Sequence, residues 1–253
     1  EYCRKRNIIF LSTPYDNESV DLLYELKVPA FKIASTDTNN IPFLKYVAKK
    51  GRPMIISTAM TNMEEVEFAV EKIKEQGLSD LAVLQCTGNY PSKLSESNLK
   101  VIKTFKRRLD CIVGYSDHTP NLINSSIATA LGAKIYEKHF TIDKNLPGPD
   151  HRMSLDPKEL FNTVKNIRDA EIALGENKKR VLDSEKENRI KLRKSIVSNT
   201  TIKKEQIINE KMVAIKRPGT GISPNMLDEL IGKKASINIP FGTPITIDMV
   251  YEK

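Results

Sequence analysis

Residues 111–141 read CIVGYSDHTPNLINSSIATALGAKIYEKHFT, and this stretch decides the fold. Two short apolar runs, residues 111–115 and 134–139, flank a segment with helical spacing, residues 122–131. Gly132 stands where we expect the helix to end, because glycine adopts the left-handed conformation that commonly closes a helix. A strand, a helix and a second strand in this order predict a βαβ unit with parallel strands.

The same pattern repeats on both sides of this stretch. We expect further strands at the runs rich in isoleucine and valine, which are residues 8–12, 30–35, 54–58 and 81–86. We expect further helices at residues 18–26, 42–50, 63–76, 96–105 and 157–174. Asn17 and Asp156 are the expected N-caps, and Gly77 is a further helix end. The alternation predicts an α/β domain built on a parallel sheet.

Six strand–helix units are fewer than the eight of a (β/α)8 TIM barrel, and no glycine-rich dinucleotide fingerprint is evident. The chain begins with glutamate instead of methionine and enters almost directly on a strand. We therefore expect a TIM barrel that lacks its first units, about two of them. The alternative is a six-unit α/β sheet that is complete in itself.

The pattern changes after Gly175. We expect a partial barrel domain over residues 1–175, a charged linker over residues 176–193 and a small β-rich domain over residues 194–253. The expected strands of the small domain are residues 194–197, 212–214, 236–239 and 245–250. Between them, RPGTGISPNMLDELIG (217–232) reads as a proline- and glycine-containing loop that leads into a short helix.

Composition restricts the class of protein. With 40% hydrophobic and 28% charged residues among 253, the chain has the make-up of a globular protein. It holds no apolar run long enough to cross a membrane, and its apolar start is too short for a signal peptide. Three cysteines, few and odd in number, favour free thiols in a reducing cytoplasm.

The net charge is +8, and much of the basic surplus lies in residues 178–204. Glutamates are interleaved there and aromatic residues are missing, so a solvated surface is favoured over nucleic-acid binding. Elsewhere a positive balance suits a small anionic substrate.

Hydroxyl side chains mark the ends of most expected strands. In a barrel of this kind, functional groups lie at the C-terminal strand ends and in the loops that follow. Ser35, Ser57, Thr87 and Ser116 would meet there with Lys32. Several hydroxyls and one ammonium group suit a phosphate. For any single hydroxyl, the alternative is a role in a turn or a helix cap.

All three histidines fall between positions 118 and 151. His118 and His139 end adjacent strands and could share one divalent metal, such as Mn, Zn or Fe. Glu137 faces the same way as His139, and could ligate the metal, orient a histidine or hold a metal-bound water. His151 follows a Pro-Gly-Pro-Asp loop and either touches substrate or packs. The alternative for the whole group is clustering by chance.

Six phrases in order resemble one family: KIAS, CTxNYP, GYSDHT, EKHFT, GPDH and a late KRPGTGIS. The chain resembles the N-acetylneuraminate synthase family, which includes the sialic, legionaminic and pseudaminic acid synthases. Its C-terminal segment resembles the SAF, or antifreeze-like, domain of those enzymes, which is a β-clip fold.

The resemblance implies a metal-dependent condensation of phosphoenolpyruvate with an N-acetylated mannosamine-type aldose, which gives a nonulosonic, sialic-acid-like acid and phosphate. The implied metal is Mn²⁺, with Mg²⁺ or Co²⁺ as alternatives. It also implies a domain-swapped homodimer. The matching positions are His118 and His139 for the metal, Lys32, Ser35, Ser57, Asn89 and Ser116 for phosphoenolpyruvate, Asp37 and Glu137 (with Lys32) for catalysis, Tyr90 and Asp150 for the sugar, and Arg217 for the sugar's N-acetyl group in the partner's site.

Some positions depart from the family pattern. Asp37 stands where many sialic acid synthases have glutamate, and STAM (57–60) replaces the commoner STGM. These departures leave the acceptor sugar open, between N-acetylmannosamine and 2,4-diacetamido-6-deoxy sugars. Two other functions stay open: a metal-dependent aldolase or isomerase on the same barrel, and a carbohydrate- or ice-binding protein with a degenerate barrel.

Overall fold

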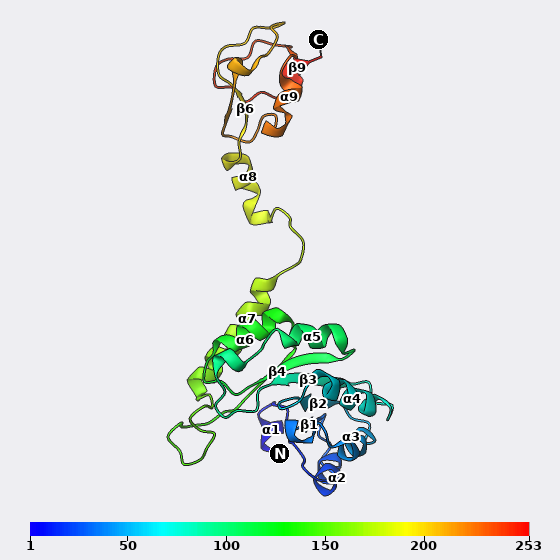
Figure 1. Ribbon diagram of the computed structural model, residues 1–253. Coiled ribbons are helices and arrows are strands. Elements are labelled where there is room, and N and C mark those ends of the chain that lie inside the picture. Colours follow the sequence, from blue (N-terminus) through cyan, green and yellow to red (C-terminus); the bar gives the residue numbers. More distant parts are fainter. Residues whose placement is uncertain (253) are drawn as a thin grey trace. The chain divides into compact units, whose positions relative to one another are not determined.

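The computed structural model describes residues 1–252, which divide into two compact units, one of residues 1–176 and one that begins at Asn177. The first unit is built on a five-stranded parallel sheet whose strands follow one another in chain order. Figure 1 shows the first four side by side. The strands are β1 (Phe31–Ile33), β2 (Met54–Ser57), β3 (Leu81–Cys86), β4 (Ile112–Asp117) and β5 (Ile135–Lys138). Sequential parallel strands form part of a barrel wall, so the predicted α/β half-barrel is confirmed.

A helix connects each strand to the next, as expected. The helices of this unit are α1 (Tyr2–Lys5), α2 (Asn17–Glu25), α3 (Ile41–Ala48), α4 (Met63–Lys74), α5 (Val101–Arg108), α6 (Ile123–Leu131) and α7 (Pro157–Leu174), with short 3₁₀ turns η1 (Ser35–Asp37) and η2 (Leu94–Glu96). Asp156 caps α7 as predicted. The cap of α2 is Asp16, which accepts a hydrogen bond from the amide of Ser19 at 2.7 Å, so the assignment to Asn17 was wrong by one residue.

The predicted strand at residues 8–12 is not formed. Ile8 and Ile9 are 63% and 75% exposed, which shows that no neighbouring layer covers them. An apolar run becomes a strand only where a second strand meets its backbone hydrogen-bonding groups, and these residues pair with none of the described strands.

The core of the first unit fills the space between the sheet and its helices. Phe31, Ile56 and Leu44 are fully buried members of it. At Gly114 in β4, an added Cβ would lie 2.5 Å from the carbonyl oxygen of Ile135 and 2.5 Å from a methyl carbon of Leu84. Glycine at this position therefore lets β4 lie close to its neighbours, which positions the residues that follow it.

The second unit is small and rich in short strands. It contains η3 (Asp183–Glu185), α8 (Lys186–Leu192), β6 (Ser195–Ser198), η4 (Glu210–Met212), β7 (Val213–Lys216), η5 (Pro224–Met226), α9 (Leu227–Leu230), β8 (Lys234–Ala235), η6 (Ile247–Met249) and β9 (Val250–Tyr251). Strands β6 and β7, and β8 and β9, form antiparallel pairs. The predicted strand at 236–239 is wrong: β8 ends at Ala235, and Ile239 makes only an isolated bridge to Ile202. Buried isoleucines form the core of this unit.

Candidate active site

A cavity of about 590 Å³ opens at the C-terminal ends of the parallel strands. It collects side chains from every strand of the sheet, because parallel strands end at one edge. The predicted site residues that line it are Lys32, Ser35, Ser57, Tyr90, Ser116, His118, Glu137, His139 and Asp150. The structure thus brings together the expected phosphate-binding and metal-binding groups.

Lys32 lies at the centre of the polar side of the cavity. Its Nζ donates to Oγ of Ser57 at 2.8 Å and to the carbonyl oxygen of Ile33 at 3.0 Å. Oε2 of Glu137 lies 3.4 Å from the same Nζ, and Oγ of Ser116 donates to Oε1 of Glu137 at 2.7 Å. The ammonium, the hydroxyls and the carboxylate therefore form one connected network across the sheet.

His118 and His139 face each other, with ring centroids 5.3 Å apart. Nδ1 of His118 lies 2.6 Å from the carbonyl oxygen of Thr87, which can only accept, so Nδ1 carries the proton and Nε2 is a free acceptor. Burial lowers the pKa of His118, which keeps its ring neutral at pH 7. Nδ1 of His139 lies 3.5 Å from Oδ2 of Asp150.

The donor set fits a divalent metal ion. Two imidazoles that directly follow adjacent strands, one of them oriented by a carbonyl, are an arrangement that metal sites commonly use. Among residues 1–252 no group of three or more His, Cys, Asp or Glu side chains is arranged to hold an ion. Two protein ligands are fewer than the three of common catalytic zinc sites, so an ion held here would take its other ligands from water or substrate.

Tyr90 covers the two histidines. Its ring centroid lies 4.1 Å from that of His118 and 5.6 Å from that of His139. Burial raises the pKa of Tyr90, so the phenol stays protonated at neutral pH and can donate a hydrogen bond. The ring gives the cavity an apolar wall beside the metal-binding groups.

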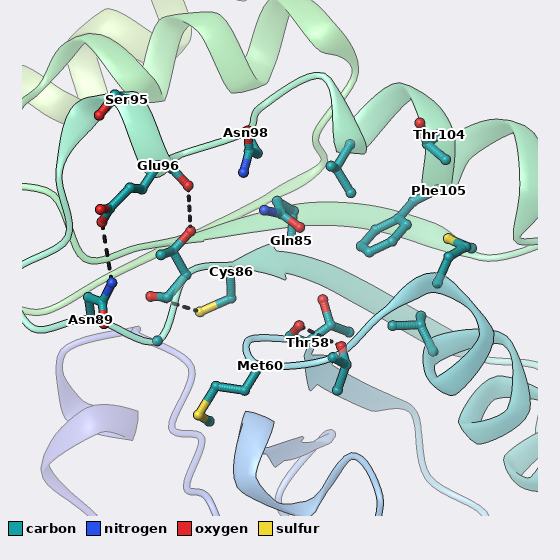
Figure 2. Close-up of a pocket in the computed structure, with 16 residues that line it drawn as sticks. Thr58, Met60, Gln85, Cys86, Asn89, Ser95, Glu96, Asn98, Thr104 and Phe105 are labelled. Carbon is teal, nitrogen blue, oxygen red and sulfur yellow. Dashed lines mark hydrogen bonds between the residues drawn. The ribbon is translucent and has the colours of Figure 1, made fainter.

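Four predicted residues lie outside this cavity. Asp37 accepts a hydrogen bond from Nδ2 of Asn40 at 3.0 Å, in the turn that leads to α3. Asn89 lines a neighbouring cavity of about 540 Å³, shown in Figure 2, where its Nδ2 donates to Oε2 of Glu96 at 3.3 Å. The hydroxyl of Thr87, expected beside Lys32, instead lines the same neighbouring cavity and donates to the carbonyl oxygen of Glu96 at 2.8 Å. Arg217 is exposed and belongs to the second unit. Their roles stay predictions.

His151 and Asp117, which lie close to the two histidines in sequence, also lie outside the cavity. Nδ1 of His151 lies 2.7 Å from Oγ1 of Thr141, so this ring packs within its loop and does not line the cavity. Asp117 is fully buried beneath the site, with Nζ of Lys138 3.3 Å from its Oδ2. Asp117 points away from the cavity that Ser116 lines, because successive side chains of β4 face opposite sides of the sheet.

Further residues line the cavity that sequence reasoning did not select: Thr13, Tyr15, Thr36, Met60 and Cys86. Each lies at or just beyond the end of an apolar run. This position could have indicated that the residue lines the site. Cys86 approaches Nδ1 of His118 at 3.8 Å, and burial raises the pKa of its thiol. It therefore stays protonated and contributes packing.

Two protein-family profiles match this chain, one over each of its two units. The NeuB family profile matches residues 1–179, and the SAF domain profile matches residues 193–250. The chain belongs to the NeuB family. Because the match spans the whole parallel sheet, it includes every strand end that contributes to the cavity.

Named NeuB relatives are similar over nearly the whole chain. The N,N'-diacetyllegionaminic acid synthase of Campylobacter jejuni is 44% identical over 94% of this chain and 72% of its own length. The enzyme of the same name from Legionella pneumophila is 40% identical over 97% of this chain and 70% of its own. The crystal structure of the spore coat polysaccharide biosynthesis protein SpsE of Bacillus subtilis matches all of this NeuB chain and 76% of its own, with a TM-score of 0.65 at 38% identity. Within residues 1–252, no helix has the length and apolar character to span a bilayer.

Proposed function

We propose that this chain carries the active site of a synthase that joins phosphoenolpyruvate to an N-acetylated mannosamine-type aldose, with a nonulosonic acid and phosphate as products. One observation carries the proposal: a single cavity holds an ammonium–hydroxyl cluster on one side and two facing imidazoles on the other. The printed names of the legionaminic acid synthase relatives support a sialic-acid-like product.

Phosphoenolpyruvate would bind on the side of Lys32. The side chain of Lys32 is only 11% exposed, so its charge is poorly screened by water and suits a phosphate dianion. Ser57 already accepts from Lys32, so its hydroxyl proton is free to point to the ligand. Ser35 and Ser116 add hydroxyls along the same rim.

The aldehyde end of the sugar would bind at His118 and His139. Mn²⁺ is the ion we propose there, with Mg²⁺ or Co²⁺ as alternatives. A divalent ion held by His118 and His139 would supply Lewis-acid polarisation of the aldehyde carbonyl. Tyr90 and Asp150 line the same end of the cavity and would contact the sugar's hydroxyl groups.

The reaction forms one carbon–carbon bond and breaks one carbon–oxygen bond. The methylene carbon of phosphoenolpyruvate attacks the aldehyde carbon, and the aldehyde oxygen takes up a proton. Water then adds at the former enol carbon, its proton is removed, and phosphate leaves with the bridging oxygen. Glu137 is suited to hold that water and take its proton, because it lies between Lys32 and Ser116 in the network.

The decisive experiment measures phosphate release by the purified chain with Mn²⁺, phosphoenolpyruvate and either N-acetylmannosamine or a 2,4-diacetamido sugar. We expect release that requires both substrates and that His118→Ala abolishes. A matched control, Glu67→Gln, removes a surface carboxylate on α4 and should leave the rate unchanged. Turnover of the sugar without phosphoenolpyruvate would instead indicate an aldolase or isomerase, and sugar binding with no turnover a binding protein.

We further propose that two chains form a homodimer in which Arg217 of one chain holds the sugar's N-acetyl group in the site of the other. The exposed guanidinium of Arg217 and the SAF match of its domain support this role. Arg217→Ala should raise the KM for the sugar far more than the KM for phosphoenolpyruvate. Equal increases, or a monomeric mass by light scattering, would contradict it.

A further inference from the structure

The two histidines follow directly after a buried ion pair that none of the proposed chemical steps uses. Asp117 in β4 and Lys138 in β5 are paired across the two strands in the parallel register. Nζ of Lys138 lies 3.3 Å from Oδ2 of Asp117, and the two side chains are only 4% and 0% exposed. Their sequence neighbours towards the C-terminus are His118 and His139.

Asp117 is held from several directions at once. Oδ2 accepts from the hydroxyl of Tyr136 at 2.6 Å, and Oδ1 accepts from the amide of Thr119 at 2.9 Å. Nδ2 of Asn124 lies 3.4 Å from Oδ1. Lys138 also donates to the carbonyl oxygen of Thr119, which closes a ring of contacts around the end of β4. This network anchors the backbone immediately before and after His118.

The pair lies on the opposite face of the sheet from the cavity. Ser116 and Glu137, which line the cavity, are the preceding pair in the same register and are joined by a hydrogen bond of 2.7 Å. Alternation along the strands then points His118 and His139 back into the cavity. A slip of one residue between β4 and β5 would turn these side chains to the other face.

We propose that Asp117 and Lys138 are positioning residues that set the separation of His118 and His139 and thereby tune metal affinity. A buried carboxylate and ammonium that attract each other tolerate one register only, because any other register leaves two uncompensated charges in the interior. The ion pair therefore fixes the register of β4 against β5 at the residues directly before His118 and His139. This inference rests on the proposed metal-binding role of the two histidines.

The test titrates Mn²⁺ alone into the full chain by calorimetry, beside titrations with phosphoenolpyruvate without metal and a melting curve for each variant. Asp117→Asn/Lys138→Met removes both charges together, so no lone charge stays buried. The control, Glu67→Gln/Arg108→Met, removes an ion pair between α4 and α5 that does not touch the histidines.

We expect the Asp117/Lys138 double variant to bind Mn²⁺ about tenfold to a hundredfold more weakly, the range found when the partners behind metal ligands are removed. Its phosphoenolpyruvate affinity, which depends chiefly on the ammonium group of Lys32 in β1, should stay within about twofold, and the control should match wild type in both titrations. A folded double variant with wild-type Mn²⁺ affinity would overturn the inference. Equal losses for both ligands would do so too, because they indicate general loosening.

Two further outcomes are decided in the same experiment. If the double variant does not fold, Tyr136→Phe replaces it, since it removes only the 2.6 Å hydrogen bond to Asp117. Weaker Mn²⁺ binding by Tyr136→Phe supports the inference and unchanged binding overturns it. Failure of the wild-type chain to bind Mn²⁺ would overturn the proposed metal role and this inference with it, and that failure is recognised because it occurs without any substitution.

Discussion

Replacing Lys32 with methionine removes the central charge of the proposed phosphate site. Methionine keeps most of the apolar stem of lysine, so packing changes little. The substitution removes the ammonium group that donates to Ser57 and lies 3.4 Å from Glu137. Among the described residues, no other lysine and no arginine lines the cavity.

The expected loss follows from the strength of hydrogen bonds to charged groups, about 1.5–3 kcal/mol each. At about 1.4 kcal/mol per factor of ten, one lost bond weakens phosphoenolpyruvate binding roughly 12- to 150-fold. The carboxylate of Glu137 is 40% exposed, so water compensates for much of its lost partner.

The assay is calorimetric titration of phosphoenolpyruvate into Lys32→Met and wild type. Lys45→Met is the matched control, because Lys45 has only a weak surface partner, Glu75 at 4.0 Å. We expect the weakened affinity in Lys32→Met alone, with sugar binding unchanged. Equal Kd values for Lys32→Met and wild type would refute the phosphate-site assignment.

Three further predictions concern stability and reactivity. Gly114→Ala places a Cβ 2.5 Å from backbone and side-chain atoms and should lower the free energy of unfolding by about 1–3 kcal/mol in urea titrations; an unchanged midpoint would contradict the close packing of β4. Asn62→Ala breaks the capping box of α4 with Glu65 and should cost about 1 kcal/mol in the same assay, whereas no loss would show that the cap is not formed in solution. Partial burial raises the pKa of Cys111 to about 11, so its thiol is protonated at pH 8. Alkylation by iodoacetamide should be slow there and accelerate as pH rises towards 11, and fast reaction at pH 8 would show that the thiol pKa is not raised.

Sequence reasoning predicted the sheet well where each strand has a neighbour. The strands from β1 to β5 lie where apolar runs indicated them. Residues 8–12 have the same composition but no partner strand, and composition alone cannot supply one. In the small unit, strands of two to four residues are set by pairing between distant segments, which a local pattern does not encode.

The site was predictable because the C-terminal ends of parallel strands lie at the same edge of the sheet. Lys32, His118 and Glu137 were expected together on that ground, and they line one cavity. The buried partnership of Asp117 with Lys138 was not foreseen, because it depends on the register of β4 against β5. Asp37 was selected on resemblance alone, and its 3₁₀ turn gives it a local partner, Asn40, outside the cavity.

In the proposed reaction the new carbon–carbon bond forms first, and phosphate then leaves phosphoenolpyruvate with its bridging oxygen. The most direct test supplies phosphoenolpyruvate with a heavy oxygen isotope in the bridging position, together with Mn²⁺ and an N-acetylated aldose, and analyses the products by mass spectrometry. We expect heavy phosphate and an acid whose mass is that of both substrates plus water, less phosphate. Light phosphate accompanied by pyruvate, with the aldose unchanged, would contradict it.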